Sequence, residues 1–203
     1  MTRPRGRPRK SDDLATRDRL LEAAAAACVE VGFDGVTLAN VAARAGVTPA
    51  AVYNHFADRD ELLYAAGRLA IDRLNASIAP AGGTAEAARS VVEEFLRPSF
   101  RPTRRLILEL HLAGARHPEL AERLAVWHGE FAALAIERSP DAPGATTLQV
   151  KALFLLLLGC CHLDDLDSLE TAPAEFSEHV GRLVDALYRP APDDAARARK
   201  LGH

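Results

Sequence analysis

The sequence predicts an all-α protein, and three observations support this fold class. Aromatic residues make up only 5% of the 203-residue chain, whereas alanine and leucine are abundant, and this balance favours helices over sheets. No stretch shows the alternation of apolar and polar residues that a half-buried strand requires. Proline and glycine instead divide the chain into segments whose apolar residues recur at helical spacing.

The first segment, residues 11–32, predicts a helix because Ser11 and two aspartates precede its apolar pattern and Gly32 can end it. Its predicted apolar face consists of residues at helical spacing: Leu14, Leu21, Ala24, Cys28 and Val31.

Two short helices separated by a tight turn follow. Thr37 caps the first and Gly46 ends it, whereas Thr48 caps the second and Pro49 occupies its first helical position. Gly46 can adopt the backbone conformation that the turn over residues 45–47 requires. The pattern therefore predicts a helix-turn-helix.

The remaining helices are longer. Asp58 caps a helix that ends near residue 78, and proline or glycine separates the later helical segments: 85–96, 104–115, 118–139, 146–166 and 173–188. The predicted domains are a basic flexible arm (1–11), a helix-turn-helix unit (12–58), a larger helical domain (59–190) and a disordered tail (191–203).

The apolar run 152–163 is too short to span a bilayer, so it predicts a helix buried between its own core and a partner subunit. The basic start leads into acidic residues rather than an apolar segment, which argues against a signal peptide. Three cysteines with one vicinal pair suit a reducing compartment, so we expect a cytoplasmic protein.

The helix-turn-helix resembles the DNA-binding motif of the TetR family of bacterial transcriptional regulators. The matching positions are Thr37, Val41, Ala42, Ala45, Gly46, Val47, Thr48, Tyr53, His55, Phe56, Arg59 and Leu62. The resemblance covers about residues 12–64 and implies a homodimeric regulator, most often a repressor, that binds a palindromic operator and is released by a small effector. The family usually has lysine at position 59, and Arg59 retains the charge.

Two kinds of DNA contact are expected. Four side chains are candidates for phosphate contact: Thr37, Tyr53, His55 and Arg59. The candidates for base contact are Thr48, Pro49, Ala50, Tyr53 and Asn54, with Leu38 and Ala39 from the preceding helix. Among them Asn54 has the amide suited to adenine, and Ala50 or Pro49 could pack against a thymine methyl group.

The N-terminal arm is strongly basic. Its cations are Arg3, Arg5, Arg7, Arg9 and Lys10, and Pro4, Gly6 and Pro8 keep it from forming a helix. Residues 11–64 hold four arginines against nine carboxylates, a formal charge of −5, which the five cations of the arm return to zero. Arg5-Gly6-Arg7-Pro8 also resembles the core of an AT-hook, which implies binding in the narrow minor groove of A·T-rich DNA. A solubilising tail is the alternative, and the adjacent DNA-binding unit favours the functional arm.

In TetR-like proteins the helices that correspond to the middle of the second half surround an effector cavity. The candidate ligand-binding residues are Phe95, Leu106, Leu110, His111, Trp127 and Phe131, which combine apolar bodies with a polar handle and imply a mainly hydrophobic ligand. Plain core packing is the alternative for most of this stripe. The last two long helices are the expected dimer interface, with contacts from Phe154, Leu157, Leu158, Val180, Leu183, Val184 and Leu187.

Other function classes are disfavoured. The chain lacks a glycine-rich phosphate loop and a nucleophile beside a base, so we expect neither an enzyme nor a cofactor. On a helix only Cys160 with Asp164, or Cys161 with Asp165, could converge, so buried thiols are preferred over a metal site. An architectural A·T-rich DNA-binding protein that uses its arm alone is the alternative function, but it leaves the long helical half without a purpose.

Overall fold

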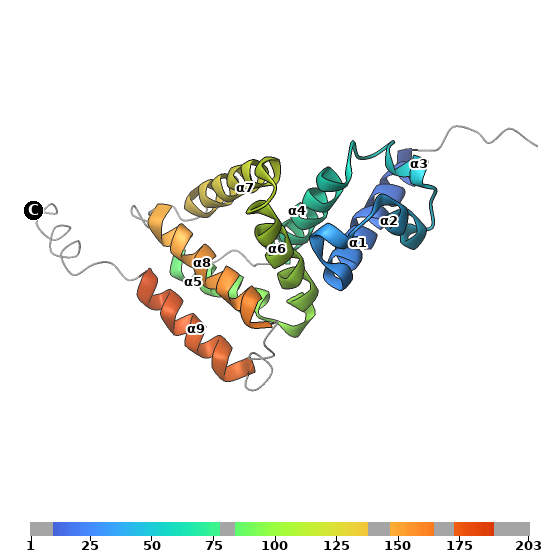
Figure 1. The fold of residues 1–203 in the computed structure, drawn as a ribbon. Helices are drawn as coiled ribbons and strands as arrows, with labels where there is room; N and C mark the ends of the chain where they lie inside the picture. Colours follow the sequence, from blue (N-terminus) through green and yellow to red (C-terminus); the bar gives the residue numbers. More distant parts are fainter. Residues whose placement is uncertain (1–9, 78–83, 138–146, 165–172, 189–203) are drawn as a thin grey trace, which may run out of the picture. The chain divides into compact units, whose positions relative to one another are not determined.

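The computed structural model describes residues 10–77, 84–137, 147–164 and 173–188, and helices are the regular structure of these residues (Figure 1). The predicted all-α fold class is confirmed. The elements are α1 (Lys10–Gly35), α2 (Leu38–Ala45), α3 (Pro49–Val52), α4 (Arg59–Ser77), α5 (Thr84–Phe95), the short 3₁₀ helix η1 (Pro98–Phe100), α6 (Arg101–Gly114), α7 (Pro118–Glu137), α8 (Thr147–Asp164) and α9 (Pro173–Leu187). The arm before Lys10 and the predicted tail lie outside the described residues.

The chain forms two compact units, each with its own core. Residues 1–73 and 102–124 make the first unit, and residues 74–101 and 125–203 make the second. The first unit thus combines the helix-turn-helix segment with α6, which follows it by more than forty residues in the sequence. The predicted boundary between residues 58 and 59 stays a prediction.

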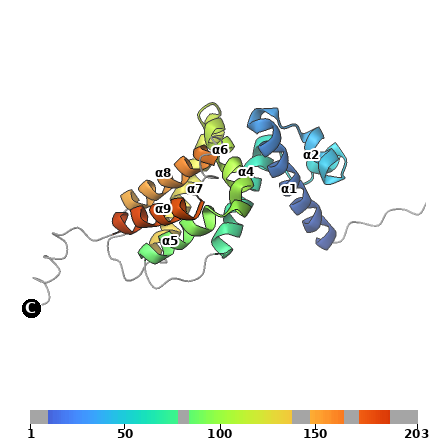
Figure 2. The same cartoon turned by 90° about the horizontal axis from the view of Figure 1, so that it is seen from below.

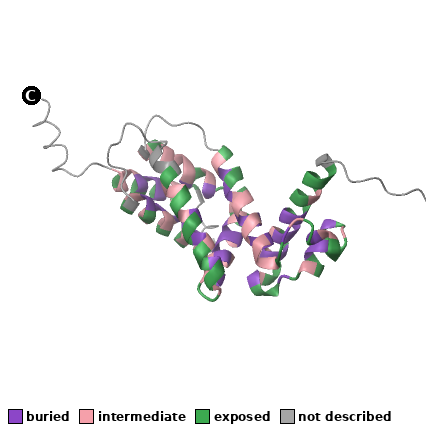
Figure 3. Ribbon diagram, turned by 90° about the horizontal axis from the view of Figure 1, so that it is seen from above, coloured by how far each residue is buried: buried purple, intermediate pink, exposed green. Residues whose placement is uncertain are grey.

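In the first unit, α2 packs on α1 and α3 packs on α2 (Figures 1 and 2). Figure 3 shows the buried positions of these helices along their shared side and the exposed positions along the other side. The side chains that fill this core include Leu20, Leu21, Cys28, Val41, Val52 and Phe56. Burial of these apolar faces fixes how the three helices cross.

The predicted apolar face of α1 is partly wrong. Leu14 and Val31, which were expected in the core, are 57% and 51% exposed. Before Gly32 the buried stripe of α1 is confined to its middle, between Leu20 and Cys28, and Phe33 is buried after the interruption. Val31 shares the helical face of Ala24 and Cys28 but lies at the end of the regular part of α1, directly before Gly32, so helical spacing alone does not show where burial stops.

Helix α6 begins at Arg101 rather than at the predicted Arg104. Pro102 lies in its first turn, where a missing N–H leaves no helical hydrogen bond unmade. Further along, α6 passes α4 so closely that a methyl group on Gly67 would overlap Cδ1 of the buried Leu110. Helix α4 itself begins as expected, because the carboxylate of Asp58 accepts the N–H of Glu61 at 2.7 Å.

In the second unit, α5 and α8 pack on α9. Val92, Leu153 and Val184 are buried between them, and Arg89 of α5 forms an ion pair with Asp185 of α9. The side-chain amide of Gln149 also donates to the carbonyl oxygen of Leu187 at 3.0 Å. Within the described residues, no helix is both long and apolar enough to cross a membrane.

Two glycine-to-alanine substitutions test the close approach of α4 and α6. Gly67→Ala should destabilise the protein by about 1–2 kcal/mol, because overpacking against Leu110 outweighs the gain in helix propensity. The control, Gly129→Ala, adds a methyl group with no heavy atom within 4 Å and should stabilise α7 by about 0.5–1 kcal/mol. Urea denaturation followed by circular dichroism measures both. Equal effects of the two substitutions would contradict the close packing.

Candidate nucleic-acid interface

The two helices of the helix-turn-helix begin at the N-cap residues that the sequence predicts. The Thr37 hydroxyl accepts the N–H of Asn40 at 3.2 Å, and the Thr48 hydroxyl accepts the N–H of Ala51 at 3.3 Å. Gly46 has φ 69° and ψ 34°, the left-handed conformation that a side chain would disfavour. The α2–α3 turn is therefore fixed at both helix ends.

Helix α3 is only one turn long, and its C-terminal end continues as hydrogen-bonded turns. The N–H groups of Asn54 and His55 donate to the carbonyl oxygens of Ala51 and Val52. These turns present Tyr53, which is 62% exposed, and the exposed Asn54. The recognition segment thus extends beyond the regular helix, to about residue 54.

The predicted base-contacting residues lie on the exposed surface of α2 and of the recognition segment. Thr48, Pro49 and Ala50 are exposed together with Tyr53 and Asn54, and from α2 Ala39 is exposed and Leu38 half-exposed. A small apolar surface with one amide suits thymine methyl groups and an adenine edge in the major groove. Their DNA contacts remain a prediction.

His55 is placed differently from the other candidates. Its side chain is only 8% exposed, and its Nε2 lies 3.6 Å from a carboxylate oxygen of Asp13 in the first turns of α1. The neighbouring Phe56 lies under the guanidinium of Arg17, 5.2 Å from the ring centroid. His55 thus packs the end of the recognition segment against α1 and has little surface to offer the predicted phosphate contact.

Arg59 is also engaged within the protein. Its guanidinium donates twice to one oxygen of Asp60, at 2.9 and 2.8 Å, and lies 4.8 Å from the ring centroid of Phe33. It also donates to the carbonyl oxygens of Phe33 and Asp34, at 3.4 and 3.3 Å. Arg59 therefore satisfies the C-terminal carbonyls of α1, and a phosphate would have to compete for it. No sequence signal linked it to α1, because the contact joins residues 25 apart.

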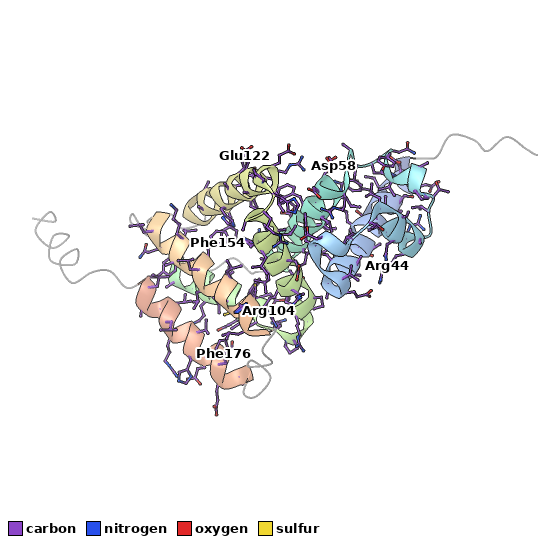
Figure 4. All side chains as sticks on the ribbon, viewed as in Figure 1. Arg44, Asp58, Arg104, Glu122, Phe154 and Phe176 are labelled. Carbon is purple, nitrogen blue, oxygen red and sulfur yellow. The ribbon has the colours of Figure 1, made fainter. Side chains whose placement is uncertain are left out.

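Two further arginines of this surface contact groups of the protein itself, which weakens their electrostatic attraction for DNA. Arg44, labelled on α2 in Figure 4, forms a two-pronged ion pair with Glu30 of α1, with N–O distances of 3.0 and 2.5 Å. Arg19 donates to the hydroxyl of Thr16. Since residues 11–64 carry a formal charge of −5, this segment without the arm is a weak partner for a polyanion.

The predicted ligand-binding residues fall in both compact units. Leu106, Leu110 and His111 lie in the first unit, whereas Phe95, Trp127 and Phe131 lie in the second. His111 and Phe131 are half-buried, and the other four are buried. Burial lowers the pKa of His111, and its Nδ1 lies 2.7 Å from the carbonyl oxygen of Ile107. Because a carbonyl only accepts, Nδ1 is the donor and Nε2 of the neutral ring is an acceptor.

The predicted dimer contacts differ in how far they are exposed on the second unit. Leu183 is exposed, but Val180, Val184 and Leu157 are buried within the second unit, and Leu158 and Leu187 are half-buried. The ring of Phe154 packs on Phe131 of its own chain, with centroids 4.8 Å apart.

Two exposed leucines of α8, Leu148 and Leu155, are absent from the predicted dimer contacts. Leu155 is 73% exposed. The two leucines are seven residues apart and therefore share one face of the helix. The apolar run from Ala152 to Cys161 hides this face, because Leu155 has the same character as its buried neighbours.

No group of three histidine, cysteine or acidic side chains within the described residues could hold a metal ion. Cys28, Cys160 and Cys161 are buried and form no disulfide, and burial raises the pKa of Cys28 to about 12. Asp165, of the considered Cys161–Asp165 pair, lies outside the described residues.

Two family models match the N-terminal part of this chain. Residues 20–66 match the model of bacterial regulatory proteins of the tetR family, and residues 2–14 match the AT hook motif. A search of the curated proteins gave no match.

Similar solved structures cover most of the chain. A putative TetR-family transcriptional regulator from Rhodococcus sp. has 25% identity over 87% of this chain and 100% of its own, with a TM-score of 0.71. A TetR-family member from Streptomyces coelicolor A3 has 29% identity, coverages of 87% and 99%, and a TM-score of 0.65. The multidrug binding protein EbrR, complexed with imidazole, has 28% identity, coverages of 95% and 98%, and a TM-score of 0.63.

The Glu30–Arg44 ion pair predicts a gain of DNA affinity on removal of the carboxylate. Glu30→Gln should release Arg44 and steepen the salt dependence of duplex binding by up to about 0.9 logarithmic units per added phosphate contact. Glu22→Gln is the matched control, since it removes the same charge from α1 and breaks a similar exposed pair with Arg73. Fluorescence anisotropy over a salt series measures both slopes. Equal slopes would mean that Arg44 does not reach DNA.

Proposed function

We propose that this chain, a transcriptional regulator of the TetR family, binds a palindromic operator as a homodimer, represses transcription, and is released by a small, mainly hydrophobic effector. The exposed surface of α2 and the recognition segment carries this proposal. It presents Tyr53, Asn54 and Ala50 on a backbone that Gly46 and two threonine caps hold rigid.

Homodimer formation fits the exposed apolar residues of the second unit. Leu148 and Leu155 of α8 and Leu183 of α9 are large, apolar and exposed in the single chain. Burial of such side chains against a second copy removes apolar surface from water. A two-fold dimer would then present two recognition segments to two half-sites of one duplex.

The basic arm supplies the electrostatic attraction that the folded unit lacks. Helix α1 begins at Lys10, and the arm before it carries four arginines. The AT hook match over residues 2–14 supports insertion of Arg5-Gly6-Arg7-Pro8 into an A·T-rich minor groove beside each half-site. The AT hook match alone would also suit an architectural protein, but the exposed recognition segment favours the operator-binding regulator.

The proposed effector is a small, mainly hydrophobic molecule. Trp127, Phe131 and Phe95 of the second unit supply apolar surface that suits such a ligand. Imidazole in EbrR is a precedent for a small ligand in a similar fold. Effector binding releases the operator if it favours a dimer whose recognition segments no longer match the spacing of the half-sites.

Selection from a random duplex pool tests the operator directly. The full chain should enrich one inverted repeat whose half-site centres lie about one helical turn, or a multiple of it, apart. Sedimentation of the chain should show two copies per enriched duplex or a multiple of two. Enrichment of A·T-rich sequences without symmetry would support the architectural protein instead.

Deletion of residues 2–10 tests the arm. The shortened chain should bind the selected operator more weakly and with a flatter salt dependence, by up to about 0.9 logarithmic units for each lost phosphate contact. A chain in which the five cations of the arm become glutamine separates charge from length and should behave like the deletion. An unchanged salt slope in both variants would exclude the arm from DNA binding.

A further inference from the structure

We propose that Glu109 of α6 is a positioning residue for operator binding, because its carboxylate holds the end of α1 from which α2 departs. The inference rests on the proposed function and adds a residue that the DNA-binding motif does not contain. All of its contacts lie within the first compact unit.

The contact forms where α1 is interrupted. Gly32 has φ 72° and ψ 168°, which breaks the helical backbone one residue before Phe33. The N–H of Phe33 donates to Oε2 of Glu109 at 3.1 Å, across 76 residues of sequence. A part-buried N–H that leaves the helical ladder needs such an acceptor, because an unmade hydrogen bond there is costly.

Gly32 also leaves the space that the carboxylate occupies. A Cβ atom at this position would lie 3.3 Å from Oε2 of Glu109, and its backbone conformation is one that side chains rarely adopt. The glycine thus serves both the interruption of α1 and the approach of Glu109.

The carboxylate of Glu109 is held in place on its own helix. Its Oε1 lies 2.9 Å from Nη2 of Arg105, one turn earlier on α6, and the side chain of Glu109 is only 13% exposed. An ionised carboxylate with both oxygens engaged has few alternative orientations. Glu109 therefore acts as a rigid link between α6 and Phe33.

A second link joins the same segment to the end of α6. Asp34 accepts hydrogen bonds from Arg116 at 2.6 Å and pairs with His117 at 3.0 Å. These partners lower the pKa of Asp34, so its carboxylate stays charged at neutral pH. The ring of His117 also lies 5.3 Å from that of Phe33. The two links hold Phe33 and Asp34 at two points of one scaffold.

The start of α2 depends on this segment. Val36 is buried, its N–H lies 3.4 Å from the carbonyl oxygen of Phe33, and Thr37 caps α2 in the next position. The short connection leaves α2 little freedom once Phe33 is fixed. Loss of the Glu109 contact should therefore lower the population of the DNA-competent arrangement, and the apparent affinity falls by the same factor.

Three substitutions of Glu109 distinguish a role in positioning α2 for DNA binding from a role in stability alone. Glu109→Ala removes the acceptor, Glu109→Gln keeps an acceptor without charge, and Glu109→Asp keeps the charge but shortens the reach by one methylene. Glu122→Ala, on the exposed side of α7 (Figure 4), is the control. Operator affinity is measured by anisotropy on the full chains, at a temperature at which circular dichroism shows each variant folded, with hydrogen exchange followed over residues 30–37.

Glu109→Ala and Glu109→Asp should bind the selected operator about tenfold more weakly and exchange faster over residues 30–37. Glu109→Gln should stay within about threefold of the parent chain, and Glu122→Ala should match it. Wild-type affinity of a folded Glu109→Ala chain, or of Glu109→Asp where alanine prevents folding, would overturn the proposal. Equal losses in Glu109→Gln and Glu109→Ala would also overturn it and assign the role to the Arg105 pair. A parent chain without preference for any symmetric duplex would instead refute the proposed function.

Discussion

The left-handed backbone of Gly46 is the constraint on which the recognition surface depends. It ends α2 and turns the chain within three residues, so that Thr48 can cap α3. The buried side chains of Val41, Val52 and Phe56 then fix the crossing of the two helices. Because α3 contributes only one regular turn, the tight turn and its caps, rather than helix length, determine how Tyr53 and Asn54 are presented.

Electrostatics and recognition are divided between different parts of the chain. Residues 11–64 present an amide and small apolar groups, while Glu30 and Asp60 engage two of their four arginines. The arm carries the unbalanced positive charge. In the proposed regulator, such a division would let the arm supply attraction that is independent of sequence and leave discrimination to the recognition segment. It also explains why a chain with a net charge of −3 can be suited to bind DNA.

The sequence predicted the helices and the caps well, because capping residues, glycine and proline act locally. Thr37, Gly46, Thr48 and Asp58 all occupy the predicted positions. Predictions from periodicity failed where tertiary context decided the outcome: Leu14 and Val31 follow the helical spacing of α1 but lie outside its buried middle and are exposed. The roles of Arg59 and Glu109 could not be predicted, since each depends on contacts with Phe33 from a distant part of the sequence. The exposed face of α8 was equally hidden, because Leu155 lies in an apolar run from Ala152 to Cys161.

In the proposed complex, two recognition segments of a dimer read one duplex while basic arms lie in the flanking minor grooves. Hydroxyl-radical footprinting of the full chain on its selected operator tests this arrangement most directly. The account predicts two symmetric protected half-sites, with additional minor-groove protection outside them that disappears when the arm is deleted. Continuous protection without symmetry, unchanged by loss of the arm, would contradict it.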